Sequence, residues 1–397
     1  MLAQVRRGLI TALFLPLVML SFLVRKNGAI WVFGAWNGIQ YSDNPRYLFE
    51  LMNTTETTIR PIWVSKSHVV VERVRAAGYR AYYWMSLEGI FYSLRAGVAV
   101  VSHSADDVNP YASYRAKIFK ITHGTPMKRM GKDNRFLYPE RRSRRLYEYV
   151  RSISPQRKTP VVAFVSSELS RFRFESAYRG SSISVVNSGY PRWMGITESR
   201  GVLWRFIQEK VGALRVSEFD KIVMYAPTRR ANRSFKLELG KDLVDFVIEA
   251  NEKKYFVVLR PHPSLQINIS DKASLELVDR GFLEVTCHQI EDVNSTLQDV
   301  DVLLTDYSSI IYDYCILGRP SFLYAPDLDD YIVSDTGLYD DYGKAEPALK
   351  INSLLEALDP TLLKEASSKA EAFKALHCGA DAVKACDTIV KTIKERI

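Results

Sequence analysis

The chain has 397 residues, of which 47% are hydrophobic and 12% aromatic, and its formal net charge is +9. This length and composition exclude a disordered chain and predict a globular protein with two α/β domains. Its four cysteines have no metal-ligand spacing and are too sparse for a disulfide framework, which favours a reducing compartment such as the cytosol.

The first 26 residues predict a membrane anchor. An uncharged apolar run, residues 8–24, lies between two pairs of basic residues. Its length is at the lower limit for crossing a bilayer, and Pro16 would kink a helix there. No small-x-small cleavage site follows the run, so an anchor that spans the bilayer or inserts shallowly is favoured over a secretory signal. The globular body is then expected at the cytoplasmic face of the cell membrane.

Strands alternate with helices between residues 27 and 195, which predicts a first Rossmann-like domain. The expected strands are 29–33, 60–64, 80–83, 98–102, 118–122, 161–166 and 183–186. The expected helices are 44–52, 67–77, 86–96 and 168–178. This alternation is typical of a parallel sheet covered on both faces, in which ligands bind beyond the carboxyl ends of the strands.

Two polar segments follow expected strand ends in this domain. Ser102-His103-Ser104 follows one strand, and His123 follows another, directly before Gly124 and a stiffening Pro126. A lone histidine is more often structural than catalytic. The strand end, the flexible turn and the basic neighbours nevertheless favour a functional His123.

A strongly basic segment runs from Lys128 to Lys158, with eleven Lys or Arg against three acidic residues. A segment of this kind can serve nucleic acid, an anionic membrane or a phosphorylated substrate. A solvated helix face is the usual interpretation of mixed charges, but it suits so one-sided a run less well.

Residues 196–397 predict a second Rossmann-like domain. The expected strands include 221–226, 255–259, 302–304 and 322–324, and amphipathic helices close the chain from residue 360. Pro227-Thr228-Arg229-Arg230 follows the first of these strands, and Arg260-Pro261-His262-Pro263 follows the second. Planar guanidinium groups grip phosphate oxygens bidentately, and the two prolines hold His262 in an extended loop.

Residues 300–326 read as strand, tight turn, helix and strand. At the turn, Asp306-Tyr307-Ser308-Ser309 places two hydroxyls and unpaired backbone N–H groups at a helix N-terminus, where the dipole favours an anion such as phosphate. Ser308 could equally be an ordinary N-cap without a ligand. The local sequence leaves both interpretations open.

Five motifs occur in one order between about residue 30 and about residue 335. They are His123-Gly-Thr-Pro-x-Lys128, Gly189-Tyr-Pro-Arg192, Ala226-Pro-Thr-x-Arg230, Arg260-x-His-Pro263, and Thr305-Asp-Tyr-Ser-Ser309 with Asp313. Together they resemble the CDP-glycerol glycerophosphotransferase family of teichoic acid synthesis. The resemblance implies a GT-B-like α/β fold of two facing Rossmann-like domains, behind the expected anchor helix.

The resemblance also implies an activity. Glycerol phosphate would pass from CDP-glycerol to a hydroxyl of a polyprenyl-diphosphate-linked saccharide or growing polymer at the inner face of the membrane, with release of CMP. The expected partners are therefore CDP-glycerol, this lipid-linked acceptor and the membrane surface, the last through residues 1–26 and 128–158, and no nucleic acid. The chain has the size of the short, primase-like members.

Residue roles follow from the resemblance by matching positions. His123 would be the general base on the acceptor hydroxyl, and His262 would act with it by stabilising the CMP leaving group. The donor would be held by Thr228, Arg229, Arg230, Arg260, His262, Thr305, Asp306, Ser308, Ser309 and Asp313. The acceptor side would include Gly124, Thr125, Lys128, Arg129 and Arg192.

The expected site holds no metal and requires no cofactor, although a divalent cation stays open. Asp299-Val-Asp301 and Asp327-Leu-Asp329 both imitate a metal-binding D-x-D pattern. We interpret the first as the lead into a strand and the second as a solvated loop. Cationic side chains could then replace a metal.

Three alternatives remain. A GT-B glycosyltransferase with a nucleotide-sugar donor would use the same diphosphate cradle, because fold does not fix chemistry. A ribitolphosphotransferase would use CDP-ribitol instead. A non-catalytic basic protein that binds nucleic acid or acidic polymer is less favoured, because it needs no histidines at two strand ends and the sequence has no recognised nucleic-acid module.

Overall fold

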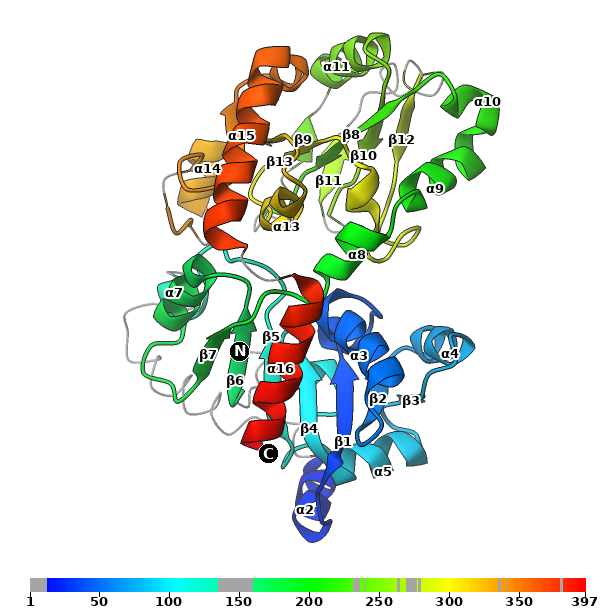
Figure 1. Cartoon of the computed structure of the whole chain (residues 1–397), viewed down its shortest axis with the longest axis vertical. Coiled ribbons are helices and arrows are strands. Elements are labelled where there is room, and N and C mark those ends of the chain that lie inside the picture. Colours follow the sequence, from blue (N-terminus) through cyan, green and yellow to red (C-terminus); the bar gives the residue numbers. More distant parts are fainter. Residues whose placement is uncertain are drawn as a thin grey trace. The chain divides into compact units, whose positions relative to one another are not determined.

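A computed structural model describes residues 13–134, 160–230, 236–238, 240–262, 265–268, 277, 280–334, 337–340, 342–378 and 381–397. The chain divides into two compact units, which we describe separately (Figure 1). Unit 1 comprises Met1–His123, Tyr138–Arg192 and Ala380–Ile397, and unit 2 comprises Gly124–Leu137 and Trp193–Gly379. The boundaries expected from the sequence, 27–195 and 196–397, differ from this division in three segments, the shortest of which is residues 193–195 in unit 2. The residues directly after His123 belong with unit 2, and the last helix belongs with unit 1.

Unit 1 is built on a seven-stranded parallel sheet with the order β3-β2-β1-β4-β5-β6-β7. Its strands are β1 (Asn27–Gly34), β2 (Arg60–Ser65), β3 (Ala81–Tyr83), β4 (Ala96–Val101), β5 (Lys117–Ile121), β6 (Val162–Val165) and β7 (Ser184–Asn187). Its main helices are α3 (Asp43–Thr55), α4 (His68–Ala76), α5 (Leu87–Arg95), α7 (Glu168–Ala177) and α16 (Ala382–Arg396).

Serine residues are the N-caps of three of these helices. The hydroxyls of Ser67, Ser86 and Ser167 each accept a hydrogen bond from the backbone N–H three residues further on, which satisfies a free donor in the first turn. The central strands are buried on both faces, as parallel strands between helices are expected to be. Local capping and apolar runs therefore explain why the expected elements form where they do.

Unit 2 contains a six-stranded parallel sheet with the order β12-β10-β8-β13-β14-β15 and a separate pair, β11-β9. The strands are β8 (Lys221–Ala226), β9 (Lys236–Glu238), β10 (Tyr255–Leu259), β11 (Gln266–Asn268), β12 (Phe282–Glu284), β13 (Val302–Thr305), β14 (Ser321–Tyr324) and β15 (Leu349–Ile351). The helices are α8 (Trp193–Glu198), α9 (Val202–Val211), α10 (Ala213–Val216), α11 (Gly240–Glu252), α13 (Ile310–Tyr314), α14 (Leu328–Ser334) and α15 (Pro360–His377).

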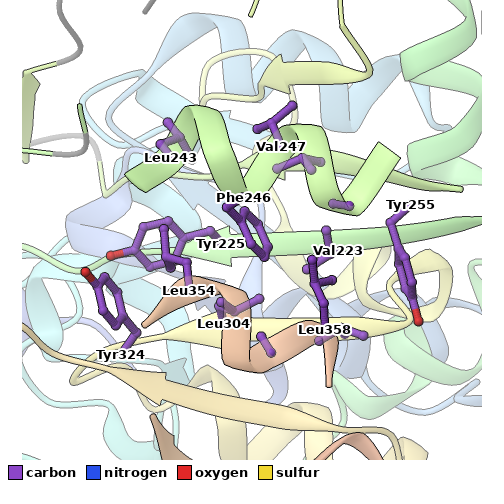
Figure 2. Close-up of a cluster of buried hydrophobic side chains, with 14 of the residues drawn as sticks. Val223, Tyr225, Leu243, Phe246, Val247, Tyr255, Leu304, Tyr324, Leu354 and Leu358 are labelled. Carbon is purple, nitrogen blue, oxygen red and sulfur yellow. The ribbon is translucent and has the colours of Figure 1, made fainter. Parts of the chain in front are cut away.

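The core of unit 2 joins its sheet to α11 and to the 3₁₀ helix Leu354–Leu358. Val223 of β8 and Leu304 of β13 lie beneath Phe246 of α11, and Leu358 packs against the same cluster (Figure 2). Burying one large apolar side chain contributes about 1.5–3 kcal/mol, so this cluster holds β8 and β13 firmly side by side. The loops that leave these two strands at their carboxyl ends are thereby brought together.

The prediction of two parallel-sheet α/β domains is confirmed. Strands β12 and β15, and the helices between residues 193 and 216, were not predicted. Each of these two strands has only three residues and lies at an edge of the sheet, so its apolar signal is weak.

The described part of the N-terminal segment contains α2 (Leu15–Leu23), which belongs to unit 1. Phe14 stacks on Tyr111 with ring centroids 4.7 Å apart, whereas Leu15, Met19 and Leu23 are exposed. Within the described ranges, no helix combines the length and hydrophobicity needed to cross a bilayer. Residues 1–12, and the part of the basic segment from residue 135 to residue 158, lie outside the described residues.

Candidate functional site

The site of unit 1 lies where the strand order reverses, between β1 and β4. Ligands of such sheets bind outside the carboxyl ends of the strands at this switch point. Trp36 follows β1, His103 follows β4 and His123 follows β5, and these three strands are neighbours in the sheet. The topology therefore gathers three rings from distant parts of the sequence.

The three rings form one cluster. The rings of His103 and His123 are stacked, with centroids 4.0 Å apart and planes 11° from parallel. The Trp36 ring lies 4.7 Å from that of His103 and 6.1 Å from that of His123. As a residue His123 keeps an exposed surface, although the groups around its ring remove part of the ring's hydration.

A buried carboxylate, Asp107, holds the loop that carries His103. Its Oδ2 accepts hydrogen bonds from the backbone N–H groups of Ser102 (2.8 Å) and His103 (2.7 Å) and from the Ser102 hydroxyl (3.1 Å). Its Oδ1 accepts from the backbone N–H of Asn37 at 2.7 Å, which ties in the loop after β1. A Cβ on Gly34 would overlap the backbone carbonyl oxygen of Asp107, so this close packing requires glycine there.

Asn44 fixes the backbone beside His123. Its amide nitrogen donates to the carbonyl oxygen of Thr122 at 2.8 Å, and its amide oxygen accepts from the backbone N–H of Arg192 at 3.0 Å. The Thr122 hydroxyl also lies 2.5 Å from that of Tyr190. His123 is thus anchored through the residue before it, and its ring also has a hydrogen bond with the backbone of Ser102.

Arg192 belongs to the buried hydrogen-bond network beside His123 and does not lie at the surface. The residue is buried, and its Nη1 donates to Oδ1 of Asp43 at 2.9 Å. Asp43 has a φ of +65°, which a residue other than glycine rarely adopts and which often marks a functional site. The predicted acceptor contact of Arg192 remains a prediction.

The electrostatics of unit 1 favour neutral imidazoles. Loss of hydration, and then the positive charges of His103, Lys120 and Arg192, lower the pKa of His123 well below its usual value. Burial likewise lowers the pKa of His103, against the opposing effect of Asp107. His123 can therefore accept a proton at neutral pH, as a general base must.

The corresponding place in unit 2 lies between β8 and β13. Asp306, which follows β13, is fully buried and accepts hydrogen bonds from the backbone N–H of Thr228 at 3.0 Å and from its hydroxyl at 2.8 Å. It also accepts from the backbone N–H of Tyr307 at 2.6 Å and pairs with Arg230 at 2.7 Å. The Asp306 carboxylate thus joins the loops that follow these two strands.

Arg230 is a buried cation shared by two carboxylates. Besides Asp306, it donates bidentately to Asp327, from Nε at 2.6 Å and from Nη2 at 2.9 Å. Its guanidinium also lies over the ring of Tyr307, which stacks on Tyr331 at 3.6 Å. The interpretation of Asp327 as part of a solvated loop is therefore wrong, because its carboxylate is needed to neutralise Arg230.

Three basic side chains of unit 2 act on one another. His262 and Arg229 both keep exposed surfaces, and Lys128 lies 5.2 Å from the centre of the Tyr331 ring. Partial burial, and then the charges of Arg229 and Lys128, lower the pKa of His262, while Asp306 opposes them. A concentration of positive charge of this kind is suited to an anionic ligand.

The segment after His123 contributes to unit 2 through a second pairing. Gly124 has a φ of +136°, which suits glycine, and Lys128 forms an antiparallel bridge with Leu338. Arg129 donates from its Nε to the carbonyl oxygen of Leu338 at 2.8 Å, and Thr125 is buried. Lys128 and Arg129, expected on the acceptor side, are thereby grouped with the residues expected to bind the donor.

Four other predicted donor residues have partners within unit 2. The Thr305 hydroxyl donates to the carbonyl oxygen of Ala226 at 2.6 Å, and Asp313 accepts from the indole nitrogen of Trp193 at 3.0 Å. Arg260 is buried and donates to the carbonyl oxygens of residues 285, 286 and 290, and burial lowers its pKa to about 10. The Ser308 hydroxyl accepts from the backbone N–H of Ile310 at 3.3 Å.

Ser308 and Ser309 remain half-exposed at the start of α13, which has only five residues. The macrodipole of so short a helix is weak, so hydroxyl and N–H groups favour an anion there more than the dipole does. The D-x-D pair at Asp299 and Asp301 accepts hydrogen bonds from the backbone N–H groups of Gly201, Leu203 and Ile222.

Sequence reasoning missed the residues that support the two sites, namely Asp43, Asn44, Asp107, Asp327 and Tyr331. His103 was noted in the polar turn that follows its strand, but no role was predicted for it. A signal for Asp107 existed, since an acidic residue a few positions after a strand end often binds the amides of that turn. Asp43, Asn44, Asp327 and Tyr331 each have a partner 75 or more positions away in the sequence, which no local pattern reveals.

The comparison with family profiles and with curated proteins identifies one family. A profile described as "CDP-Glycerol:Poly(glycerophosphate) glycerophosphotransferase" matches residues 17–395. The teichoic acid glycerol-phosphate transferase of Staphylococcus aureus is 27% identical over 387 residues, which cover 94% of this chain and 95% of that protein. The teichoic acid poly(glycerol phosphate) polymerase of Bacillus subtilis is 25% identical over 378 residues, which cover 92% of this chain but only 48% of the polymerase.

Among solved structures, the wall teichoic acid polymerase TagF matches with a TM-score of 0.72 at 23% identity, over 100% of this chain and 99% of that chain. This likeness shows a GT-B-type fold, and the two parallel-sheet α/β domains that the sequence predicted are part of it.

Proposed function

The chain belongs to the CDP-glycerol:poly(glycerophosphate) glycerophosphotransferase family, and from this premise we propose how its residues carry out the transfer. Members of this family transfer glycerol phosphate in teichoic acid synthesis. We propose that the donor is CDP-glycerol, that the acceptor is a hydroxyl of a polyprenyl-diphosphate-linked saccharide or growing polymer, and that CMP leaves.

One observation carries the proposal: the position and state of His123. Its ring lies beside the switch point of its sheet, is held by a neighbouring ring, and has a lowered pKa that leaves it neutral. In the proposed reaction His123 accepts the proton of the acceptor hydroxyl. The freed oxygen attacks the β-phosphorus of the donor in line, and the bond from that phosphorus to the bridging oxygen of CMP breaks.

We assign the donor diphosphate to the positively charged loops of unit 2. Arg229 and His262 have exposed surfaces there, and Lys128 acts electrostatically on His262. These groups would neutralise the charge that develops on the CMP oxygens, as Arg and Lys clamps do in phosphoryl transfer. The contacts of Arg230 and Asp306 with each other and with Asp327 support a positioning role for both.

We further propose that the protein works at the cytoplasmic face of the cell membrane, where its lipid-linked acceptor would be found. The exposed apolar side chains of α2 support this, because an apolar helix face can lie in the headgroup region without crossing the bilayer. Replacing Leu15, Met19 and Leu23 with glutamine should reduce sedimentation with anionic vesicles while sparing activity on a soluble acceptor. Unchanged sedimentation would contradict the role of α2.

The central experiment uses the purified full chain, CDP-glycerol and a soluble lipid-linked disaccharide analogue. CMP release is measured, and the product mass reports donor, acceptor and number of units added. The variant His123→Asn should lower kcat by about 10²- to 10⁴-fold, the usual contribution of a general base, with donor affinity within about twofold of wild type. Unchanged turnover would exclude His123 as the base.

The same assay separates the alternatives by donor. CDP-ribitol and UDP-sugars are offered in parallel, and only the preferred donor should release its nucleotide rapidly. A preference for UDP-sugars would support a glycosyltransferase, which can share this architecture because fold does not fix chemistry.

A further inference from the structure

A second histidine lies against the proposed base, and a chain of hydrogen bonds leads from it to a carboxylate. His103 Nδ1 lies 2.8 Å from the Ser102 hydroxyl oxygen, which lies 3.1 Å from Oδ2 of Asp107. Ser102 and Asp107 are fully buried. The chain therefore operates away from bulk water, where charge-assisted hydrogen bonds are stronger.

Hydrogen counting fixes the tautomer of His103. The Ser102 hydroxyl has one hydrogen, and the carboxylate of Asp107 can only accept, so this hydrogen points to Asp107. The contact between Ser102 and His103 then requires an N–H on Nδ1 of the imidazole. Since Asp107 stabilises a positive charge on His103 through this chain, the first proton taken up by the stacked pair resides on His103 and not on His123.

The stacking itself transfers no proton. In rings only 11° from parallel, with centroids 4.0 Å apart, neither ring directs an N–H at a nitrogen of the other. Two imidazolium ions in this arrangement would repel each other strongly. A proton on His103 therefore opposes a proton on His123.

We propose that His103 is a positioning residue for the general base proposed above: its ring fixes the plane of His123 and keeps that base in its neutral, proton-accepting form. The inference rests on the proposed role of His123. It explains why a second ionisable ring lies at the switch point, and why a buried carboxylate stands behind that ring rather than behind the base.

Other charged groups around His123 act in both directions. Lys120 of β5 and Arg192, which follows β7, also oppose a proton on His123. Asp43, at the start of α3, pairs with Arg192 and weakens its effect, and Asp107 acts mainly on His103. Removing His103 should therefore reduce, but not abolish, the suppression of the positive charge on His123.

The test is an NMR titration of the histidine ring protons of the full chain, which has only six histidines. The signal of His123 is assigned by its loss in His123→Gln. In His103→Gln the pKa of His123 should rise by about one pH unit. The acid limb of kcat/KM for CMP release should move to higher pH by the same amount, with the donor KM within about twofold of wild type. In Ser102→Ala the His123 pKa should move in the same direction by a smaller amount.

His68→Gln is the matched control. His68 stacks on Tyr83 in the same unit, with centroids 4.0 Å apart and planes 13° from parallel, but it lies outside the cluster of Trp36, His103 and His123. Its loss should leave the His123 titration and the acid limb unchanged.

Two outcomes would overturn the inference. One is a His123 pKa that stays at its wild-type value in both His103→Gln and His103→Phe, at unchanged melting temperature. The other is a shift equally large in His68→Gln. The proposed function fails differently, through absent CMP release by the wild type or full activity of His123→Asn. The NMR titration is readable in either case, so the two failures are distinguishable.

Discussion

The two units use different chemistry to hold together the loops at the switch points of their sheets. In each, a fully buried aspartate at the switch point of a parallel sheet joins the loops that follow two central strands. Asp107 does so with three backbone N–H groups and one hydroxyl. Asp306 uses two N–H groups, one hydroxyl and the guanidinium of Arg230. Among the described residues, no Lys or Arg forms an ion pair with Asp107.

This difference matches the two proposed tasks. Asp107 accepts hydrogen bonds from amides and a hydroxyl and keeps part of its negative charge available, and in unit 1 that charge acts on His103 and on Lys66. A carboxylate balanced by arginine has less charge left over, and in unit 2 its attraction for a proton on His262 is outweighed by burial and by the charges of Arg229 and Lys128. The first arrangement tunes a base, and the second suits an anionic ligand.

The largest expected effect comes from Asp306→Ala. The change leaves Arg230 buried with Asp327 as its remaining carboxylate partner, and removing one member of a buried ion pair costs about 3–5 kcal/mol. The free energy of unfolding, measured by urea denaturation, reports the loss. A loss below about 1 kcal/mol would show that Asp327 alone neutralises Arg230.

Asp107→Asn should destabilise less, by about 2 kcal/mol. The side-chain amide can accept from one N–H but turns its own NH₂ towards other donors, which leaves buried N–H groups unsatisfied. Urea denaturation measures the change. A loss as large as that of Asp306→Ala would contradict the idea that the two carboxylates are balanced differently.

Arg230→Lys tests the ion pairs of unit 2. Lysine cannot reproduce the bidentate contact with Asp327, so stability should fall by about 1 kcal/mol while the donor KM stays within about twofold. Arg229→Lys, at an exposed neighbour, is the control and should leave stability unchanged. A large rise in donor KM for Arg230→Lys at unchanged stability would instead support the direct donor contact predicted from the sequence.

The smallest effect is the pH dependence that the histidines of unit 1 add to stability. Their pKa values are lowered in the folded protein, so the unfolded chain binds more protons as the pH falls below about 6.5. Stability should be full above this pH and should decline as the pH falls towards the lowered values. His103→Gln should flatten the decline between pH 7.5 and 5.5, and His68→Gln should not.

Much of the fold was predictable because its signals are local. Apolar runs marked the central strands, and a serine before each of α4, α5 and α7 marked its start. The boundaries of the compact units were less accessible. The pairing of Lys128 with Leu338 joins positions more than 200 residues apart, and no sequence pattern near either residue predicts it.

The exposed residues of the candidate site could be predicted from the sequence, whereas the buried residues that hold them in place could not. His123, Arg229 and His262 follow strand ends, a position that sequence periodicity locates well. Asp43, Asn44 and Asp327 act through long-range hydrogen bonds whose partners only the fold reveals. Arg230 shows the limit of chemical type as a guide, since its guanidinium has carboxylate partners within the chain itself.

The return of α16 to unit 1 has a practical consequence for anyone who wishes to study the halves in isolation. This helix buries four side chains, those of Ala385, Cys386, Ile389 and Ile393. Part of the core of unit 1 therefore comes from the C-terminal residues of the chain. A fragment cut near residue 195 would expose the apolar surface that this helix covers and would be prone to aggregate. Grafting residues 381–397 onto the end of such a fragment through a flexible linker should restore its solubility.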